Sequence, residues 1–135
     1  MRTLVLDASV VFKWFRPQQP HVDAARLIRE DYAAGRLSIA VPSLLFLEVL
    51  NAAARRWSWD DSAVRQLATD LSALAFEVTE PAVGAVAAWT SRGLTAYDAA
   101  YVAVAEAIGV RLVTDDALVT SVAAEVVLPL ASYRG

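Results

Sequence analysis

Apolar and polar residues alternate along the chain in blocks that predict short buried strands, each followed by one or more amphipathic helices. The first apolar run, residues 3–6, is rich in β-forming residues and ends at Asp7, which predicts a buried strand. Comparable runs predict strands over 37–41, 76–78 and 110–114, and a fifth strand over 126–128 if that short run pairs. The sheet is therefore expected to have four to five strands.

Between these runs the apolar residues recur at helical spacing. Pro17 and Pro20 close the first helix, while Gly35, Gly93 and Gly109 each follow a helical segment as C-caps. The expected N-caps and first-turn residues are Ser43, Asp60 or Asp61, Pro81 and Thr95. The predicted helices run over 9–15, 22–34, 42–56, 60–74, 81–92, 96–108 and 115–123.

Alternation of this kind predicts an α/β fold: a three-layer α/β/α sandwich around a short, mostly parallel central sheet. The 135 residues suit a single domain over 1–135, without repeats or linkers. No apolar run approaches the roughly 20 residues of a membrane span, and Asp7 interrupts the region that a secretion signal would need. We expect a cytoplasmic globular protein with no membrane association.

The amino-acid composition excludes several kinds of catalytic and binding site. The absence of cysteine excludes disulfides and thiolate sites, and the single histidine, His21, leaves zinc sites and serine triads without parts. The five glycines form neither a P-loop nor a dinucleotide motif. With 15 acidic and 12 basic residues, the net charge of −3 argues against an extended electrostatic nucleic-acid binder.

Several acidic residues stand at positions where a solvated surface charge is not expected. Asp7 ends the first predicted strand, and Asp115 and Asp116 directly follow the fourth. Because ligands of open parallel sheets bind outside the carboxyl ends of the strands, these acids should face one crevice. Glu48 interrupts an apolar helix (LLFLEVL), and Asp98 lies in the first turn of another. We expect all five acids to converge there.

Carboxylates gathered in this way repel one another strongly. A pair about 4 Å apart costs about 4 kcal/mol at an effective dielectric constant of 20. Either their pKa values rise or a cation holds them together. Oxygen ligands without histidine or cysteine suit a hard ion such as Mg²⁺ or Mn²⁺, which commonly serves phosphoryl chemistry.

Each acid also has a purely structural interpretation. Asp7 and Asp115 are candidate N-caps of the helices that follow them, and for Asp115 we favour the cap. Asp98 gains from the dipole at the start of its helix. Glu48 is the hardest to explain, since a glutamate is rarely buried without a partner. Partners on the same helix face would be Asn51 or Arg55.

Four ordered segments resemble the motifs of PIN-domain nucleases, and more narrowly those of the VapC toxins of bacterial toxin–antitoxin pairs. They are VLDAS at 5–9, LEVLN at 47–51, TAYDAAY at 95–101 and LVTDDAL at 112–118. The resemblance covers essentially the whole chain and implies a PIN-like sandwich. It places the family's catalytic and metal-binding acids on Asp7, Glu48, Asp98 and Asp116, the last by a Thr-x-Asp pattern. The supporting residues that it implies are Ser9, Asn51, Thr114 and Asp115.

The resemblance also implies an activity and partners. The expected activity is an endoribonuclease dependent on Mg²⁺, with Mn²⁺ able to substitute, that hydrolyses RNA by metal-activated water. The expected partners are a second copy of the chain in a homodimer and a cognate VapB-like antitoxin that inhibits the enzyme and alone carries it to promoter DNA. Which of Asp115 and Asp116 is the principal ligand stays open at this point.

Other residues have weaker assignments. Arg55, Arg56 and Arg92 are candidates for binding RNA phosphate, and two tryptophans, Trp57 and Trp59, for stacking on bases, although exposed arginines and partly buried tryptophans are equally ordinary. The 57% hydrophobic content also fits a protein partner. Candidate groove residues for an antitoxin helix are Phe12, Trp14, Phe15 and Phe46, for each of which core packing is the better interpretation.

Two other functions compete with the nuclease. A catalytically silent PIN domain would bind RNA or protein without cutting, although the presence of all four acids argues against it. A Mg²⁺-binding receiver-like domain would need a lysine near the last strand, and the only lysine is Lys13.

Overall fold

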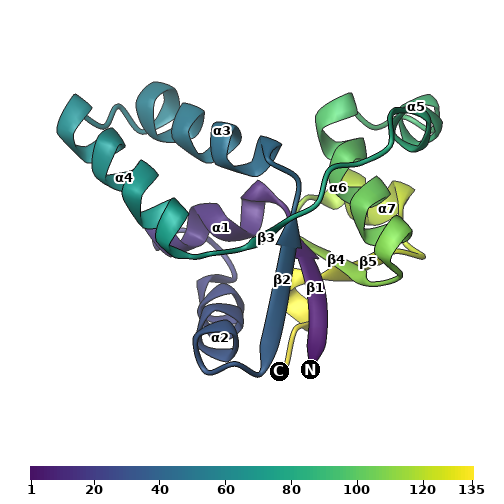
Figure 1. Ribbon diagram of the computed structural model, residues 1–135, viewed down its shortest axis with the longest axis horizontal. Helices are drawn as coiled ribbons and strands as arrows, with labels where there is room; N and C mark the ends of the chain where they lie inside the picture. Colours follow the sequence, from purple (N-terminus) through teal and green to yellow (C-terminus); the bar gives the residue numbers. More distant parts are fainter.

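Five parallel strands form the centre of the computed structural model, which describes residues 1–135 (Figure 1). The sheet order is β3-β2-β1-β4-β5. The strands are β1 (Arg2–Leu6), β2 (Leu37–Val41), β3 (Glu77–Val78), β4 (Arg111–Thr114) and β5 (Val127–Pro129). The predicted sandwich is confirmed, and the sheet is parallel throughout.

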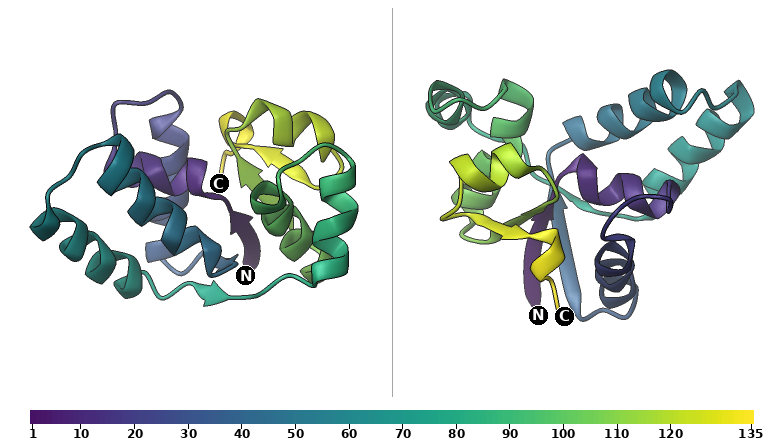
Figure 2. Two further views of the ribbon diagram at one scale, coloured as in Figure 1. Left: turned by 90° about the horizontal axis from the view of Figure 1, so that it is seen from above. Right: turned by 180° about the vertical axis from the view of Figure 1, so that it is seen from behind.

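Helices flank the sheet on both sides (Figures 1 and 2). On one side, α1 and α2 pack against each other and against the sheet, with α3 and α4 extending beside α1; on the other, α6 packs on β1 and β4 with α5 against it. The helices are α1 (Ala8–Phe15), α2 (Val22–Ala33), α3 (Leu44–Asn51), η1 (Ala52–Arg56), α4 (Asp61–Ala73), α5 (Val83–Ser91), α6 (Ala96–Ile108), α7 (Ala117–Val122) and η2 (Leu130–Ser132). None of them is both long and apolar enough to cross a membrane.

The central strands are apolar on both faces because helices cover both. Leu4, Val5 and Leu6 of β1 are each at most 1% exposed, as are Leu112 and Val113 of β4. Such continuous apolar runs are typical of strands inside a parallel sheet. The edge strand β3, in contrast, has only two residues and both are exposed.

Local capping follows the sequence signals with three exceptions. Asp60 and Thr95 cap α4 and α6 as predicted. Ser43 stands before α3, but its side chain makes no capping bond. The predicted first-turn residue Pro81 lies outside α5, which begins at Val83. The cap of α7 is Asp116 and not Asp115, because the Asp116 carboxylate accepts a hydrogen bond from the Val119 amide at 3.0 Å.

One predicted helix contains a change of winding. The segment expected to run to residue 55 or 56 is α-helical to Asn51 and then makes one wider π-helical turn, η1. The amide of Trp57 donates to the carbonyl of Ala52, five residues earlier, at 2.9 Å. Such turns often mark functional sites, because they change which side chains face a pocket.

The order of the strands defines where a ligand should bind. From β1 the chain moves outward to β2 and β3, then returns to the other side of β1 to form β4 and β5. The direction therefore reverses between β1 and β4. In open parallel sheets the crevice at the carboxyl ends of two such strands is the usual ligand site.

A matched pair of substitutions tests the difference in burial between the central strand β1 and the edge strand β3. Val5→Ala should lower the free energy of unfolding by roughly 2–3 kcal/mol, because Val5 is fully buried and its loss leaves a cavity. Val78→Ala should change it by about 0.5 kcal/mol or less, because Val78 is 51% exposed. Urea unfolding of both variants measures the difference, and equal losses would contradict this sheet order.

Candidate active site

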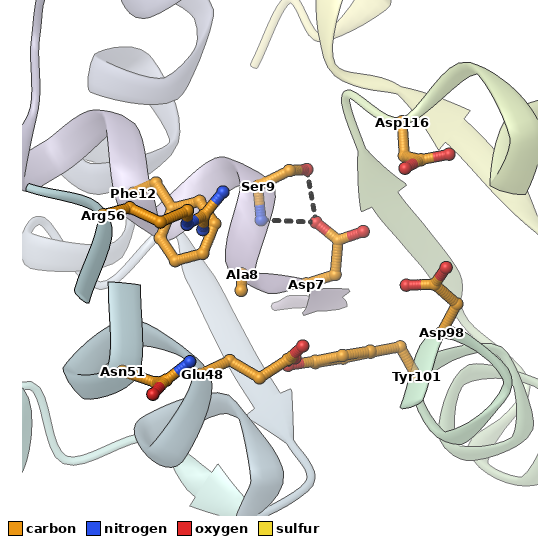
Figure 3. Close-up of a pocket in the computed structure, with 10 residues that line it drawn as sticks. All are labelled: Asp7, Ala8, Ser9, Phe12, Glu48, Asn51, Arg56, Asp98, Tyr101 and Asp116. Carbon is orange, nitrogen blue, oxygen red and sulfur yellow. Dashed lines mark hydrogen bonds between the residues drawn. The ribbon is translucent and has the colours of Figure 1, made fainter. Parts of the chain in front are cut away.

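A pocket of about 280 Å³ opens at the carboxyl ends of β1 and β4, where the strand order reverses (Figure 3). Four carboxylates line it, each from a different element. Asp7 precedes α1, Glu48 belongs to α3, Asp98 lies in the first turn of α6, and Asp116 caps α7. The other residues of the lining are Ala8, Ser9, Phe12, Asn51, Arg56 and Tyr101.

Asp7 is the most deeply placed of the four acids. It is 6% exposed, and its carboxylate accepts hydrogen bonds from the Ser9 amide at 3.0 Å, from the Ser9 hydroxyl and from the Thr114 hydroxyl. Burial raises the pKa of Asp7 to about 6, although these hydrogen bonds to the charged form oppose the rise. The negative charge of Asp98 adds to the rise.

Glu48 is held by a residue that the sequence patterns did not single out. The hydroxyl of Tyr101, on α6, donates a hydrogen bond to Glu48 Oε1 across the space between α3 and α6 (Figure 3). The expected partners on its own helix, Asn51 and Arg55, do not form this bond. Burial raises the pKa of Glu48, and Asp98 raises it further, while the Tyr101 hydrogen bond and the charge of Arg56 lower it.

Asp98 and Asp116 stand on the same side of the pocket (Figure 3). Burial raises the pKa of Asp98, and the nearby Asp116 charge adds to this, while the hydrogen bond with Thr95 lowers it. Asp116 is exposed, and its amide donates to the Thr114 hydroxyl at 3.1 Å. The same hydroxyl that holds Asp7 therefore also fixes the start of the Asp116 turn.

The four acids form no ion pair with a basic side chain. No ion pair of the structure involves Asp7, Glu48, Asp98 or Asp116. Arg56 is the one positively charged side chain in the lining. Such a set of unpaired carboxylate oxygens fits a hard divalent cation. As the side chains stand, no three of them are close enough to hold one ion.

Three of the four predicted supporting residues lie at the pocket. Ser9 and Asn51 line it, and Thr114 lies behind Asp7 with no exposed surface. Asp115 does not line it, so the expectation that five acids converge is wrong for this one. Its carboxylate accepts instead from Lys13 Nζ at 3.1 Å and pairs with His21 Nδ1 at 2.8 Å.

The arginines proposed for RNA binding are placed differently from one another. Arg56 lines the pocket, with its guanidinium 4.9 Å from the centre of the Phe12 ring. Arg55 is exposed and lies outside the lining. Arg92 is bound to Glu125 at 3.1 Å and to the carbonyl of Val122 at 3.2 Å, away from the pocket. Only Arg56 is thus brought to the acids.

The aromatic residues form a cluster beside Arg56. Phe12 meets Trp57 edge to face at 5.5 Å, and Trp57 meets Trp59 at 5.4 Å. All three rings are partly buried and pack against the core. The same holds for the other residues expected to line a partner groove, Trp14, Phe15 and Phe46.

Tyr101 is the main site residue that sequence reasoning missed. Its signal was present, since it follows Asp98 by three residues and so shares a face of α6 with it. In the sequence, an aromatic residue among alanines and valines at helical spacing resembles an ordinary core residue, and Tyr101 is indeed only 1% exposed. Phe12 was considered only for a partner groove.

Comparison with known proteins identifies the class. A family model of the PIN domain matches residues 4–125. The chain therefore belongs to the PIN domain family, whose members are typically nucleases and usually use divalent metals.

A solved structure agrees on the fold. The crystal structure of PAE2754 from Pyrobaculum aerophilum superposes with a TM-score of 0.71 at 22% sequence identity, over 97% of this chain and 91% of that one. No curated protein sequence matches at a significant level.

The raised pKa of Asp7 predicts how the metal-free protein depends on pH. A carboxyl group whose pKa is higher in the folded than in the unfolded state favours folding at low pH, and this contribution is lost as pH rises through about 6. Asp7→Asn retains a capping side chain and removes the charge. At pH 7 the variant should therefore be more stable than the wild type, by up to roughly 3 kcal/mol.

Urea unfolding in EDTA at several pH values measures this effect. The difference between the two proteins should shrink as pH falls from 7 towards 4, the window between the folded and unfolded pKa values. A difference that stays constant over this range would show that Asp7 is not penalised by burial.

Proposed function

We propose that this protein is a divalent-metal-dependent endoribonuclease that acts as the toxin of a toxin–antitoxin pair. The observation that carries the proposal is the set of four carboxylates, from four separate elements, that line one pocket without an ion-pair partner. Membership of the PIN domain family supports a nuclease. The toxin role rests on the resemblance of the four motifs to VapC proteins.

Asp7, Glu48, Asp98 and Asp116 would hold the metal, Mg²⁺ or Mn²⁺. Bound there, such an ion supplies Lewis-acid polarisation of the phosphate and activation of water for attack. The protein's part is to keep the acids in place. Ser9 and Thr114 hydrogen-bond the Asp7 oxygens, and Tyr101 hydrogen-bonds Glu48.

The remaining groups of the pocket suit a phosphate ester as the substrate, and the resemblance to VapC proteins favours RNA. Arg56 offers a cation at the rim of a strongly acidic pocket, where it can bind a phosphate oxygen. Neither a histidine nor a lysine lines the pocket, so carboxylates are its only protein groups able to accept a proton near neutral pH. Attack of water in line with the P–O3′ bond would leave a 5′-phosphate and a 3′-hydroxyl.

The proposed protein partners are a VapB-like antitoxin and a second copy of the chain. Large apolar side chains stay exposed near the pocket, with Leu47 at 66% and Tyr97 at 63%. A protein partner that covers them would remove apolar surface from water, which favours association. Promoter DNA would be reached only through the antitoxin.

Cleavage of single-stranded RNA tests the proposed activity. The wild type should cut in Mg²⁺ or Mn²⁺ and not in EDTA. Asp98→Asn should reduce the rate by at least about a hundredfold, because it removes a charge from the acidic pocket. Asp61→Asn, an exposed change on α4 outside the pocket, is the matched control and should cut normally.

Two results would argue against this function. Cleavage by Asp98→Asn at the wild-type rate would overturn the assignment of the site. A pure wild-type protein that binds RNA but never cuts it would favour the silent PIN domain.

Tyr101→Phe tests the role of the hydroxyl that holds Glu48. Without this hydrogen bond the pKa of Glu48 should rise, because the bond stabilises the charged form. The acid limb of the rate–pH profile should then move to higher pH, and Mg²⁺ affinity should fall by about 10–100-fold. Loss of stability alone, with an unchanged profile and unchanged Mg²⁺ affinity, would make Tyr101 a packing residue only.

A further inference from the structure

A second, smaller pocket lies between α1 and α2 and is rich in positive charge. Its volume is about 90 Å³, and three of its six lining residues are the cations Lys13, Arg26 and Arg29. The others are Trp14, Pro17 and Val22. No acidic residue lines it. The proposed active site does not use any of these side chains.

Lys13 forms the fixed inner wall of this basic pocket. Its side chain is only 4% exposed, and its Nζ lies 3.1 Å from Asp115 Oδ2 and 3.4 Å from Gln19 Oε1. A buried ammonium group held in this way keeps one position, because moving it would leave the buried lysine without its carboxylate partner.

Arg29 is a charged group without a charged partner. It makes no ion pair and no hydrogen bond, and its guanidinium instead lies 5.5 Å from the centre of the Trp14 ring and 5.8 Å from that of Phe15. The Trp14 ring is itself fixed, since its Nε1 donates to the carbonyl of Ala25 at 2.8 Å. Stacking thus orients the guanidinium while its N–H groups stay available.

Arg26 adds a third donor that is easily released. Its ion pair with Asp23 is 3.3 Å long and joins two exposed side chains, of 58% and 92% exposure. Exposed pairs of this kind are weak. Three cations line the pocket, and only the carboxylates of Asp23 and Asp115 bind them, which leaves a net positive charge.

The size and donor set of the basic pocket select an oxyanion. Guanidinium and ammonium groups donate strongly to phosphate oxygens, and arginine does so with a planar pair of N–H groups. A volume of about 90 Å³ suits a single phosphate group and is too small for a whole nucleotide.

The basic pocket is joined to the acidic one through Asp115. This residue binds Lys13 through its carboxylate, and its amide donates to the Ser9 hydroxyl at 3.0 Å. Ser9 and the next residue, Asp116, both line the acidic pocket. Asp115 thus contacts one lining residue of each pocket.

We propose that the pocket of Lys13, Arg26 and Arg29 is a phosphate subsite that binds a phosphate of the RNA strand other than the one that is cut. The subsite rests on the proposed function, because it takes RNA as the ligand. It would hold the strand in register over the acids and so contribute to RNA affinity and not to the chemical step.

Binding of a labelled short single-stranded RNA in EDTA tests the subsite without cleavage. Fluorescence anisotropy is measured over a range of salt for the wild type, Arg29→Gln and Arg26→Gln/Arg29→Gln. The double variant should bind about tenfold more weakly at low salt. The plot of the logarithm of the RNA association constant against the logarithm of the salt concentration should become less steep by about 0.7 for each lost phosphate contact. Arg65→Gln, which removes an exposed arginine paired with Asp61 on α4, is the control and should bind as the wild type does.

The outcomes separate this subsite from the proposed function. If the wild type binds and cuts RNA and the folded double variant matches Arg65→Gln in affinity and salt slope, the subsite is wrong and the nuclease stands. If the wild type neither binds nor cuts RNA, both the subsite and the proposed nuclease are wrong.

Titration with inorganic phosphate is the second experiment. If the double substitution abolishes phosphate binding and leaves RNA affinity unchanged, the pocket serves free phosphate and the RNA assignment is overturned. Circular dichroism and thermal unfolding confirm that each variant is folded.

Discussion

The burial of a single carboxylate, that of Asp7, is the constraint on which the rest of the acidic pocket depends. A charged group at the end of a buried strand is unfavourable unless donors surround it, and here Ser9 and Thr114 supply them. These contacts tie the end of β1 to the first turn of α1 and to the end of β4. The arrangement still leaves the pKa of Asp7 high, so the fold keeps a site that is stabilised only when positive charge arrives. The buried Asp7 carboxylate therefore lowers the folding stability at the pocket where the chemistry is proposed to occur.

Charge is distributed unevenly around this constraint. The net charge of −3 conceals an acidic pocket with four carboxylates and, on the other side of Asp115, a basic one with three cations. Asp115 and Asp116 are neighbours in sequence and serve opposite environments. One neutralises a buried lysine, and the other faces the acids. A nucleic acid responds to local charges and not to the total, so the overall charge balance does not argue against the proposed substrate.

Most of the fold followed from local signals in the sequence. Apolar runs and caps predict the strands and most helices to within a few residues, because the central strands are buried on both faces and each cap is a short-range bond. The acids Asp7, Glu48, Asp98 and Asp116 were found because strand ends and interrupted apolar helices are visible in sequence. The Tyr101–Glu48 bond was not, since it joins residues 53 positions apart on different helices. The direction of the Asp115 side chain was missed for the same reason, as its partners Lys13 and His21 lie about a hundred residues away.

The π-helical turn at Ala52–Arg56 lets the chain beside the pocket differ in length by one residue. It accommodates one more residue than an α-helical turn would, so removal of a single residue from 52–56 would restore regular winding. Because the wide turn absorbs its extra residue locally, Arg56 would keep nearly the same direction relative to Glu48. Related chains that lack one residue in this turn should therefore still be able to place a cation at the position of Arg56. The length of the chain can thus vary by one residue at this turn without disturbing any acidic residue.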